Sequence, residues 1–160
     1  MLPQANLASR AEMFKQFYWK TAAINSTAFS PGSNDDKSYQ LAYDRVTGSY
    51  SGWEIVLPET DVSNLSKLAF DIKGQSGGEI PNVWLTSPSS PEDIRNLVDI
   101  EDYVTVSTGW QRVEIPLTDF RITGGSQQTV DLKRIIRVQI VFEWEDMAGM
   151  VYVDGFAFEP

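Results

Sequence analysis

Two runs near the end of the chain show the clearest alternation of apolar and polar positions. The first run spans residues 136–144 and the second spans 150–158, after a short turn. In the first run the apolar residues recur at every second position, namely Ile136, Val138, Ile140 and Phe142. This is the period of a strand with one buried face. We interpret the second run as the partner of the first and expect the rest of the chain to form a sandwich around them.

Shorter runs with the same period predict about seven further strands. They lie at residues 14–24, 39–46, 53–57, 68–73, 83–86, 103–106 and 111–117. Pro58 is expected to close the third of them, because proline has no amide hydrogen for a strand ladder. Only the segment from Ser90 to about Leu97 favours a helix, since a capping serine precedes a proline and two acids, which predicts one or two turns.

Short strands separated by turn residues favour an all-β fold, either a sandwich or a jelly roll. A parallel sheet would need crossover helices, which the sequence does not supply. Residues 1–13 have no clear period and are interpreted as a leader or linker. Residues 14–160 are expected to form a single domain, since a chain of 160 residues can bury a sizeable core.

The charge balance disfavours two classes of partner. The chain has 13 Lys and Arg against 22 Asp and Glu, a formal net charge of −9, so a nucleic acid or an anionic membrane surface would repel it. No apolar run is long enough for a transmembrane helix, and the first residues lack the layout of a signal peptide. We expect the chain to be a piece of a longer precursor.

The chain has no cysteine and no histidine. This excludes thiol nucleophiles, Cys/His zinc sites, the serine triad and imidazole acid-base chemistry. A carboxylate pair remains possible for catalysis, as in glycoside hydrolysis. For metal binding, a hard cation with oxygen ligands such as Ca²⁺ remains possible.

The polar positions of the 136–144 run suggest a binding surface. Arg137, Gln139 and Glu143 alternate with the apolar positions, so a cation, an amide and a carboxylate share one pleated face. Fixed hydrogen-bonding groups of this kind suit a polar, hydroxyl-rich ligand. A solvated sheet face or a cross-strand ion pair would give the same pattern.

Four motifs in a fixed order resemble a known group of domains. They are Tyr50-Ser51-Gly52-Trp53, Leu68-Ala69-Phe70-Asp71-Ile72-Lys73-Gly74, the run from Gly109-Trp110 to Asp119-Phe120, and Val151-Tyr152-Val153-Asp154-Gly155-Phe156. Over residues 39–158 the chain resembles the galactose-binding-like jelly-roll carbohydrate-binding modules, nearest to families 11, 4 and 22. It also resembles the related domain of complex I intermediate-associated proteins.

The resemblance implies two facing antiparallel sheets, one of them concave and lined by residues that contact a glycan. The concave sheet would take the strands at 53–57, 84–86, 103–106 and 137–143. The residues expected to bind carbohydrate are Tyr50, Glu54, Trp84, Thr86, Tyr103, Thr105, Arg137, Gln139 and Glu143. Trp84 and Tyr103 are the candidate stacking platforms. Packing is the alternative for both rings, and it is the preferred interpretation for Trp53 and Trp110.

The resemblance also implies a structural Ca²⁺ that bridges an early loop and the last strand. Asp154 matches the acid of the last strand, and the early loop offers Asn34, Asp35 and Asp36, whose oxygens suit this cation. The chain departs from the common pattern because it has no obvious acid before Phe17. An Asx turn at 34–36 and an outward-facing Asp154 are the alternative.

We therefore interpret the chain as a non-catalytic carbohydrate-binding module for a β-glucan or related plant glycan. It is expected to be a secreted monomer, covalently linked to a glycoside hydrolase that it targets to polysaccharide. One alternative is a protein-interaction domain of the complex I intermediate-associated type. The other is an enzyme that uses Glu54 and Glu143.

Overall fold

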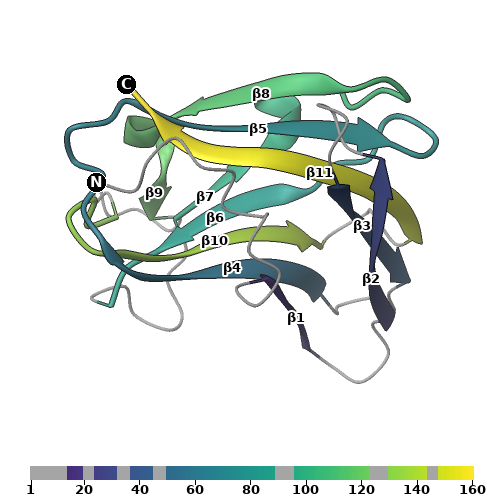
Figure 1. Ribbon diagram of the computed structural model, residues 1–160, viewed down its shortest axis with the longest axis horizontal. Coiled ribbons are helices and arrows are strands. Elements are labelled where there is room, and N and C mark those ends of the chain that lie inside the picture. Colours follow the sequence, from purple (N-terminus) through teal and green to yellow (C-terminus); the bar gives the residue numbers. More distant parts are fainter. Residues whose placement is uncertain are drawn as a thin grey trace.

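The computed structural model describes residues 14–19, 24–31, 37–44, 50–88, 96–122, 130–143 and 148–160. These residues form two antiparallel sheets that face each other (Figure 1). The six-stranded sheet has the order β1 (Phe14–Trp19), β4 (Tyr50–Thr60), β10 (Ile135–Phe142), β6 (Asn82–Thr86), β7 (Asn96–Asp99) and β9 (Arg121–Ile122). The five-stranded sheet has the order β2 (Ile24–Pro31), β3 (Lys37–Asp44), β11 (Ala148–Glu159), β5 (Lys67–Gly74) and β8 (Gln111–Pro116).

The predicted fold class, an all-β sandwich of two antiparallel sheets, is confirmed. The only helical turns in the described part of the chain are two short 3₁₀ turns, η3 (Ile100–Asp102) and η4 (Leu117–Asp119). None of the helical segments found in these residues has the length and apolar character needed to cross a membrane.

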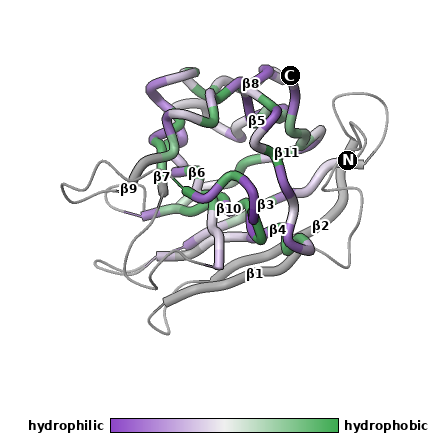
Figure 2. Tube along the Cα trace, turned by 90° about the vertical axis from the view of Figure 1, so that its left-hand side faces the viewer, coloured by the Kyte–Doolittle hydropathy of each residue, from purple (hydrophilic) through white to green (hydrophobic). Residues whose placement is uncertain are grey.

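The core lies between the two sheets and is rich in aromatic rings. Tyr43 stacks on Phe142 with 3.7 Å between ring centroids, and Phe70 stacks on Phe156 at 4.6 Å. Along the strands of both sheets, hydrophobic and hydrophilic residues alternate (Figure 2), so each sheet turns one face inward. Each fully buried large side chain stabilises the fold by about 1.5–3 kcal/mol relative to an exposed one.

The two most regular runs form the strands β10 and β11, but they do not pair with each other. β10 pairs with β4 and β6, whereas β11 pairs with β3 and β5. The expectation that the two runs are partners is therefore wrong. Each strand has both edges occupied within its own sheet, so the chain changes sheets between Phe142 and Ala148.

The first predicted strand is two strands in different sheets. The run at 14–24 divides into β1, which ends at Trp19, and β2, which begins at Ile24. β1 pairs with β4 in the six-stranded sheet, and β2 pairs with β3 in the other sheet. Periodicity alone did not show where the chain changes sheets.

Pro58 does not close its strand, because β4 continues to Thr60. The register between β4 and β10 shifts between the pairs Ile135–Thr60 and Arg137–Val56, so Pro58 falls in a bulge. A bulge tolerates proline because the ladder has no hydrogen bond there for it to miss.

The end of the predicted helix is a strand. Residues 96–99 form β7, which pairs with β6 and turns Val98 into the core, where 7% of it is exposed. Pairing with a buried neighbour overrides the local helix signal. Residues 89–95, where that signal begins, lie outside the described residues.

The predicted strand at 103–106 is also wrong, since these residues follow η3 as a loop.

Candidate functional site

The outer face of the six-stranded sheet carries a row of polar side chains. Gln139 on β10 lies between Glu54 on β4 and Trp84 on β6. Neighbouring positions on the same strands, such as Val138, are buried in the core. Because side chains alternate along a strand, Glu54, Gln139 and Trp84 share the opposite face. We call this surface the outer face of the six-stranded sheet.

Gln139 is the centre of a hydrogen-bond network on this face. Its carbonyl Oε1 accepts a hydrogen bond from Thr86 Oγ1 at 2.8 Å, and its Nε2 donates to Glu54 Oε2 at 3.4 Å. Only 9% of Gln139 is exposed, so leaving its amide unpaired would cost about 1–3 kcal/mol. The two partners set the orientation of the amide and link polar side chains on β4, β10 and β6, and we call Arg137, Glu54, Gln139 and Thr86 the array.

Arg137 is the exposed cation of the array. Its Nε lies 3.4 Å from Glu54 Oε2, an ion pair that lacks hydrogen-bond geometry. The side chain of Arg137 is 43% exposed and that of Glu54 is 18% exposed. The terminal nitrogens of Arg137 make no hydrogen bond or ion pair within the described part of the chain. The guanidinium therefore offers several donors in a fixed fork to an external acceptor.

A second polar group lies at the other end of the same face. Asn82 Nδ2 donates to Glu143 Oε1 at 2.6 Å, and Asn82 pairs with Asp99 in the strand register. Asp99 is exposed, and partial desolvation, with a smaller contribution from the charge of Asp102, raises its pKa above the usual range. Neither Asn82 nor Asp99 was among the binding residues predicted from the sequence. Asn82 alternates with Trp84 and Thr86, which was a usable signal, whereas Asp99 follows the expected helix, which was to end at about Leu97, and fell in no predicted strand.

Trp84 has the predicted orientation but not the predicted exposure. It lies on the outer face, yet only 5% of it is exposed, and its ring centroid is 6.3 Å from that of Tyr50. Trp84 is therefore a covered ring and not an open stacking platform. Tyr50, on the same face, is half-buried.

Tyr103 and Thr105 lie apart from this face. Tyr103 packs partly against the core, and its hydroxyl donates to Asp119 Oδ2 at 2.8 Å. Burial and that carboxylate raise the pKa of Tyr103. Thr105 is exposed in a loop, where its carbonyl accepts a hydrogen bond from Gln111 Nε2. The structure brings neither residue into the array around Gln139.

The strand register does not bring Glu54 and Glu143 together. Glu54 is opposite Gln139, and Glu143 follows Gln139 by four residues, which is about 13 Å along an extended chain. Each carboxylate is engaged by its own partner, Gln139 or Asn82. The geometry does not support the carboxylate pair that glycoside hydrolysis requires.

Asp154 is the one predicted metal ligand that the structure describes. It is 2% exposed, its Oδ1 accepts a hydrogen bond from the amide of Gly155 at 2.8 Å, and it pairs with Asp71 in the register of β11 and β5. The predicted ligands Asn34, Asp35 and Asp36 lie outside the described residues. Within the described ranges no cluster of three or more acids is placed to hold a metal. The Ca²⁺ site stays a prediction.

One family model matches most of the chain. The family described as Carbohydrate binding domain 30 matches residues 10–159. No curated protein matches the chain.

Solved structures of carbohydrate-binding modules share the fold. A family 11 module of a cellulosomal cellulase of Clostridium thermocellum aligns with a TM-score of 0.74 and 23% identity, over 91% of this chain and 86% of that one. The family 11 module of this organism in complex with a β-1,3-1,4-mixed-linked tetrasaccharide aligns with a TM-score of 0.74 and 22% identity, over 92% and 91%. A family 30 module of another cellulosomal cellulase of this organism gives 0.66 and 21%, over 91% and 88%.

Proposed function

This chain belongs to the carbohydrate binding domain 30 family, and from that premise we propose that the outer face of its six-stranded sheet binds a β-linked glucan. The chain is a carbohydrate-binding module of the galactose-binding-like jelly-roll type, as the resemblance implied. The matching family is number 30, and family 11 is among the structural neighbours.

One observation carries the proposed site, and it is the array of Arg137, Glu54, Gln139 and Thr86. The array offers the exposed guanidinium of Arg137 next to the partly exposed carboxylate of Glu54. The buried amide of Gln139 forms hydrogen bonds with Glu54 on β4 and with Thr86 on β6. A sugar hydroxyl donates one hydrogen bond and accepts others, so an adjacent donor and acceptor match it. Fixed groups of this kind give orientation and specificity to a binding site.

Two arguments favour a neutral β-glucan as the ligand. A family 11 module with the same fold is described in complex with a β-1,3-1,4-mixed-linked tetrasaccharide. The net charge of −9 also disfavours polysaccharides that carry carboxylate or sulfate groups. The comparisons do not favour the alternative of a protein-interaction domain.

The proposed role in the full-length protein is to hold a linked catalytic domain near its polysaccharide. Two of the structural neighbours come from cellulosomal cellulases, and such linkage raises the local concentration of the enzyme on an insoluble substrate. The proposed role places the protein outside the cell, where polysaccharides occur, and requires no chemistry from this chain.

A structural Ca²⁺ at Asp154 is also part of the proposal. Asp154 is 2% exposed and offers carboxylate oxygens, the hard ligands that Ca²⁺ prefers. Val153, next to Asp154, pairs with Tyr39 on β3, and residues 34–36 directly precede this strand in the sequence because it begins at Lys37. Chelation should lower the melting temperature, because the ion would bind only the folded state. An unchanged melt in excess chelator would argue against this ion.

Affinity gel electrophoresis tests the glucan site with a matched pair of arginines. Arg137→Ala should weaken retardation by soluble mixed-linkage β-glucan about tenfold, since hydrogen bonds to charged groups contribute about 1.5–3 kcal/mol. Arg134→Ala is the control, because Arg134 is 47% exposed and pairs with Glu59 away from the array. Equal effects of both variants, or no retardation of the wild-type chain by glucans, xylans and mannans, would contradict the proposed site.

A further inference from the structure

The outer face of the five-stranded sheet carries an aromatic cluster on the other side of the sandwich. Tyr152 on β11 pairs with Lys73 on β5 and with Gln40 on β3. Trp110 precedes β8 and extends the same row, because Gln111 pairs with Ile72. All four side chains are half-buried and none belongs to the core. We call these four residues the Trp110 row.

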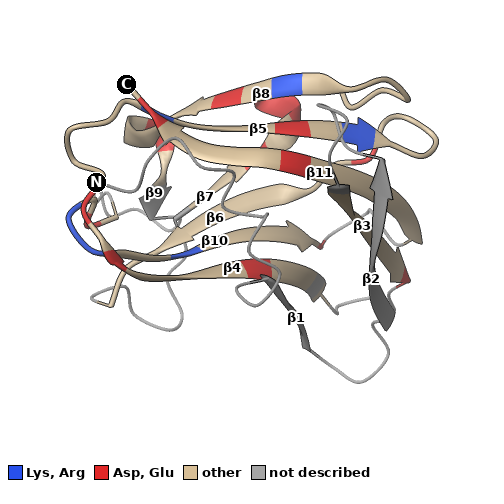
Figure 3. Ribbon diagram, in the orientation of Figure 1, with Lys and Arg blue, Asp and Glu red and all other residues tan. Residues whose placement is uncertain are grey.

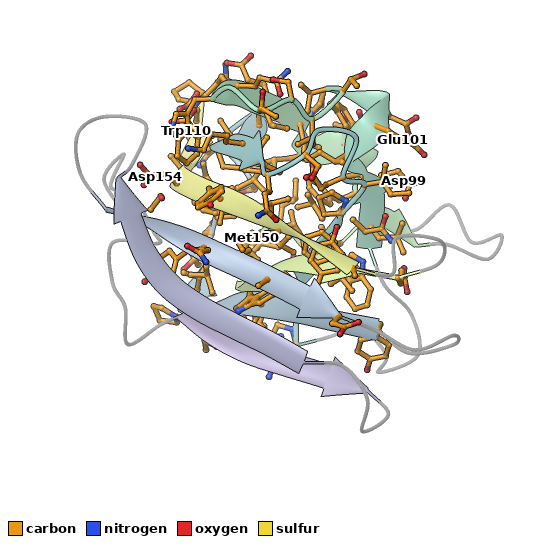
Figure 4. The ribbon with its side chains drawn as sticks, turned by 90° about the vertical axis from the view of Figure 1, so that its right-hand side faces the viewer. Asp99, Glu101, Trp110, Met150 and Asp154 are labelled. Carbon is orange, nitrogen blue, oxygen red and sulfur yellow. The ribbon has the colours of Figure 1, made fainter. Side chains whose placement is uncertain are left out.

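Lys73 joins the two rings of this row. Its Nζ lies 5.2 Å from the centroid of the Trp110 ring and 4.6 Å from that of Tyr152, which is within the range of a cation–π contact. Trp110 and Tyr152 flank β5, so they are separated by two strand spacings, about 10 Å. Trp110 and Asp154 lie at one margin of the sandwich, and Asp99 and Glu101 lie at the opposite margin (Figure 4).

Other described positions on β5, β8 and β11 of this face form ion pairs. Arg112 pairs with Asp71 and Glu159, and Lys67 pairs with Glu114. Accordingly, acidic residues lie on β5, β8 and β11, and basic residues lie on β5 and β8 (Figure 3).

The Trp110 row differs from these ion pairs. In the part of the chain that the structure describes, no hydrogen bond or ion pair engages the Lys73 ammonium, the Tyr152 hydroxyl or the Gln40 amide. Their polar groups are therefore available to a ligand.

We propose that the Trp110 row is a second carbohydrate contact, which takes two or three units of a neutral glycan. A pyranose places its C–H face on an aromatic ring and its hydroxyls at the rim. The row supplies two rings, with a cation and an amide at hydrogen-bonding positions next to them. This inference rests on carbohydrate as the ligand class of the family, but it is independent of the array around Gln139.

The small size of the row and the net charge of the chain favour a neutral sugar over a protein partner, an anionic surface or a charged glycan. Two half-buried rings are small beside a specific protein interface, which buries about 800 Å² per partner. The net charge of −9 disfavours an anionic surface or a charged glycan. With patches on opposite faces, one chain would contact two polysaccharide strands, which raises its retention on an insoluble substrate through multivalency.

Nuclear magnetic resonance titration of the intact chain tests this inference without a substitution. With a β-1,3-1,4-mixed-linked tetrasaccharide as the probe, the indole N–H of Trp110 and the amide of Tyr152 should shift together with the guanidinium signals of Arg137. Trp110→Ala should weaken the response at Tyr152 about fivefold or more, since an aromatic contact of this kind is worth about 1 kcal/mol. The response at Arg137 should persist. Glu114→Gln, a change on the same sheet face outside the row, is the control and should alter neither response.

The outcomes separate the two sites. Shifts at Arg137 without shifts at Trp110 or Tyr152 would overturn the second contact and leave the proposed function intact. Shifts in the Trp110 row alone would support the second contact and overturn the proposed site around Gln139. If the probe and soluble mixed-linkage glucan shift neither set, both proposals fail. Circular dichroism shows whether Trp110→Ala is folded, and the wild-type titration decides the question if it is not.

Discussion

Trp84 shows how a ring on the solvent side of a sheet can still act as a packed residue. It faces away from the main core, yet it is 5% exposed and its ring lies close to that of Tyr50. Trp84→Ala should therefore lower the free energy of unfolding by about 3–5 kcal/mol, the cost of a cavity left by a large aromatic ring. Urea denaturation of the variant and the wild-type chain measures this difference.

An unchanged stability of Trp84→Ala would contradict this prediction. If Trp84→Ala unfolds at the same urea concentration as the wild-type chain while glucan binding falls, Trp84 is an open stacking platform in solution. Trp84→Phe is the matched control, because it keeps a ring in the covered position and should recover part of the stability.

Asp99 gives a prediction that depends on pH. Partial desolvation and the charge of Asp102 raise its pKa, so the folded chain binds this proton more tightly than the unfolded chain does. The contribution of Asp99 to stability therefore falls as pH rises from its usual value of about 3.8 through its folded pKa. Asp99→Asn should raise the melting temperature at pH 7.

The control compares the melting temperatures of Asp99→Asn and the wild-type chain at a pH below the pKa that Asp99 has in the unfolded chain. There Asp99 is protonated in both states, so Asp99→Asn should melt like the wild-type chain. Thermal melts at pH 7 and at about pH 3 provide the two values. A variant that is less stable at pH 7 would show that the ionised carboxylate is stabilised by a partner and not penalised by desolvation.

The residues of the array were predictable because they alternate with core residues. Arg137, Gln139, Glu54 and Thr86 lie on strands whose period is plain in the sequence, so their shared face followed from the pleat. The sequence could not show that Trp84 is covered, since burial on that side depends on distant segments. The sequence could not place Tyr103 either, because its position depends on a tertiary contact, the hydrogen bond from its hydroxyl to Asp119.

At the scale of one element, β11 depends on a bulge at Gly155. The register with β5 shifts between Asp154 and Ala157, which allows both Val153 and Phe156 to face the core. Gly155 has φ of 63°, a conformation that costs an L-residue about 1–2 kcal/mol. Its carbonyl also accepts a hydrogen bond from Arg112 Nη1 at 3.1 Å, which ties the bulge to the edge strand β8.

Gly155→Ala should consequently destabilise the chain by about 1–2 kcal/mol. An added Cβ would also lie 3.0 Å from Asp71 Oδ2 and 3.2 Å from Arg112 Nη1. Gly109→Ala is the matched control, because its nearest neighbour would be Ser107 Oγ at 3.9 Å, and it should change stability by less than about 0.5 kcal/mol. Denaturant midpoints of both variants test this, and equal losses would show that the bulge is not under this constraint.

The strands with strict alternation were predictable, and the elements defined by pairing were not. β5, β6, β8, β10 and β11 appear close to the expected positions, because one buried face imposes a period of two. A helix-capping signal precedes β7 in the sequence, and its pairing with β6 and β9 makes it a strand. The continuation of β4 past Pro58 likewise depends on a bulge against β10.

At the scale of the whole molecule, the sandwich separates two surfaces of different character. One face carries the array around Gln139, with an exposed arginine beside a carboxylate. The opposite face carries ion pairs and the Trp110 row. The chain as a whole carries a net charge of −9, which gives no long-range electrostatic attraction for a neutral glycan. Binding at either surface must therefore come from short-range contacts.

This charge distribution predicts that glucan binding resists salt. Hydrogen bonds and ring contacts to a neutral sugar involve no release of counterions, in contrast to binding of a polyanion. Affinity for mixed-linkage β-glucan should change by less than about twofold between low salt and about 0.5 M NaCl, although exposed ion pairs weaken over that range. Isothermal titration calorimetry at the two salt concentrations measures it. A tenfold loss of glucan affinity would contradict this prediction, and stronger binding of polygalacturonate than of glucan at low salt would show that the surface prefers a charged ligand.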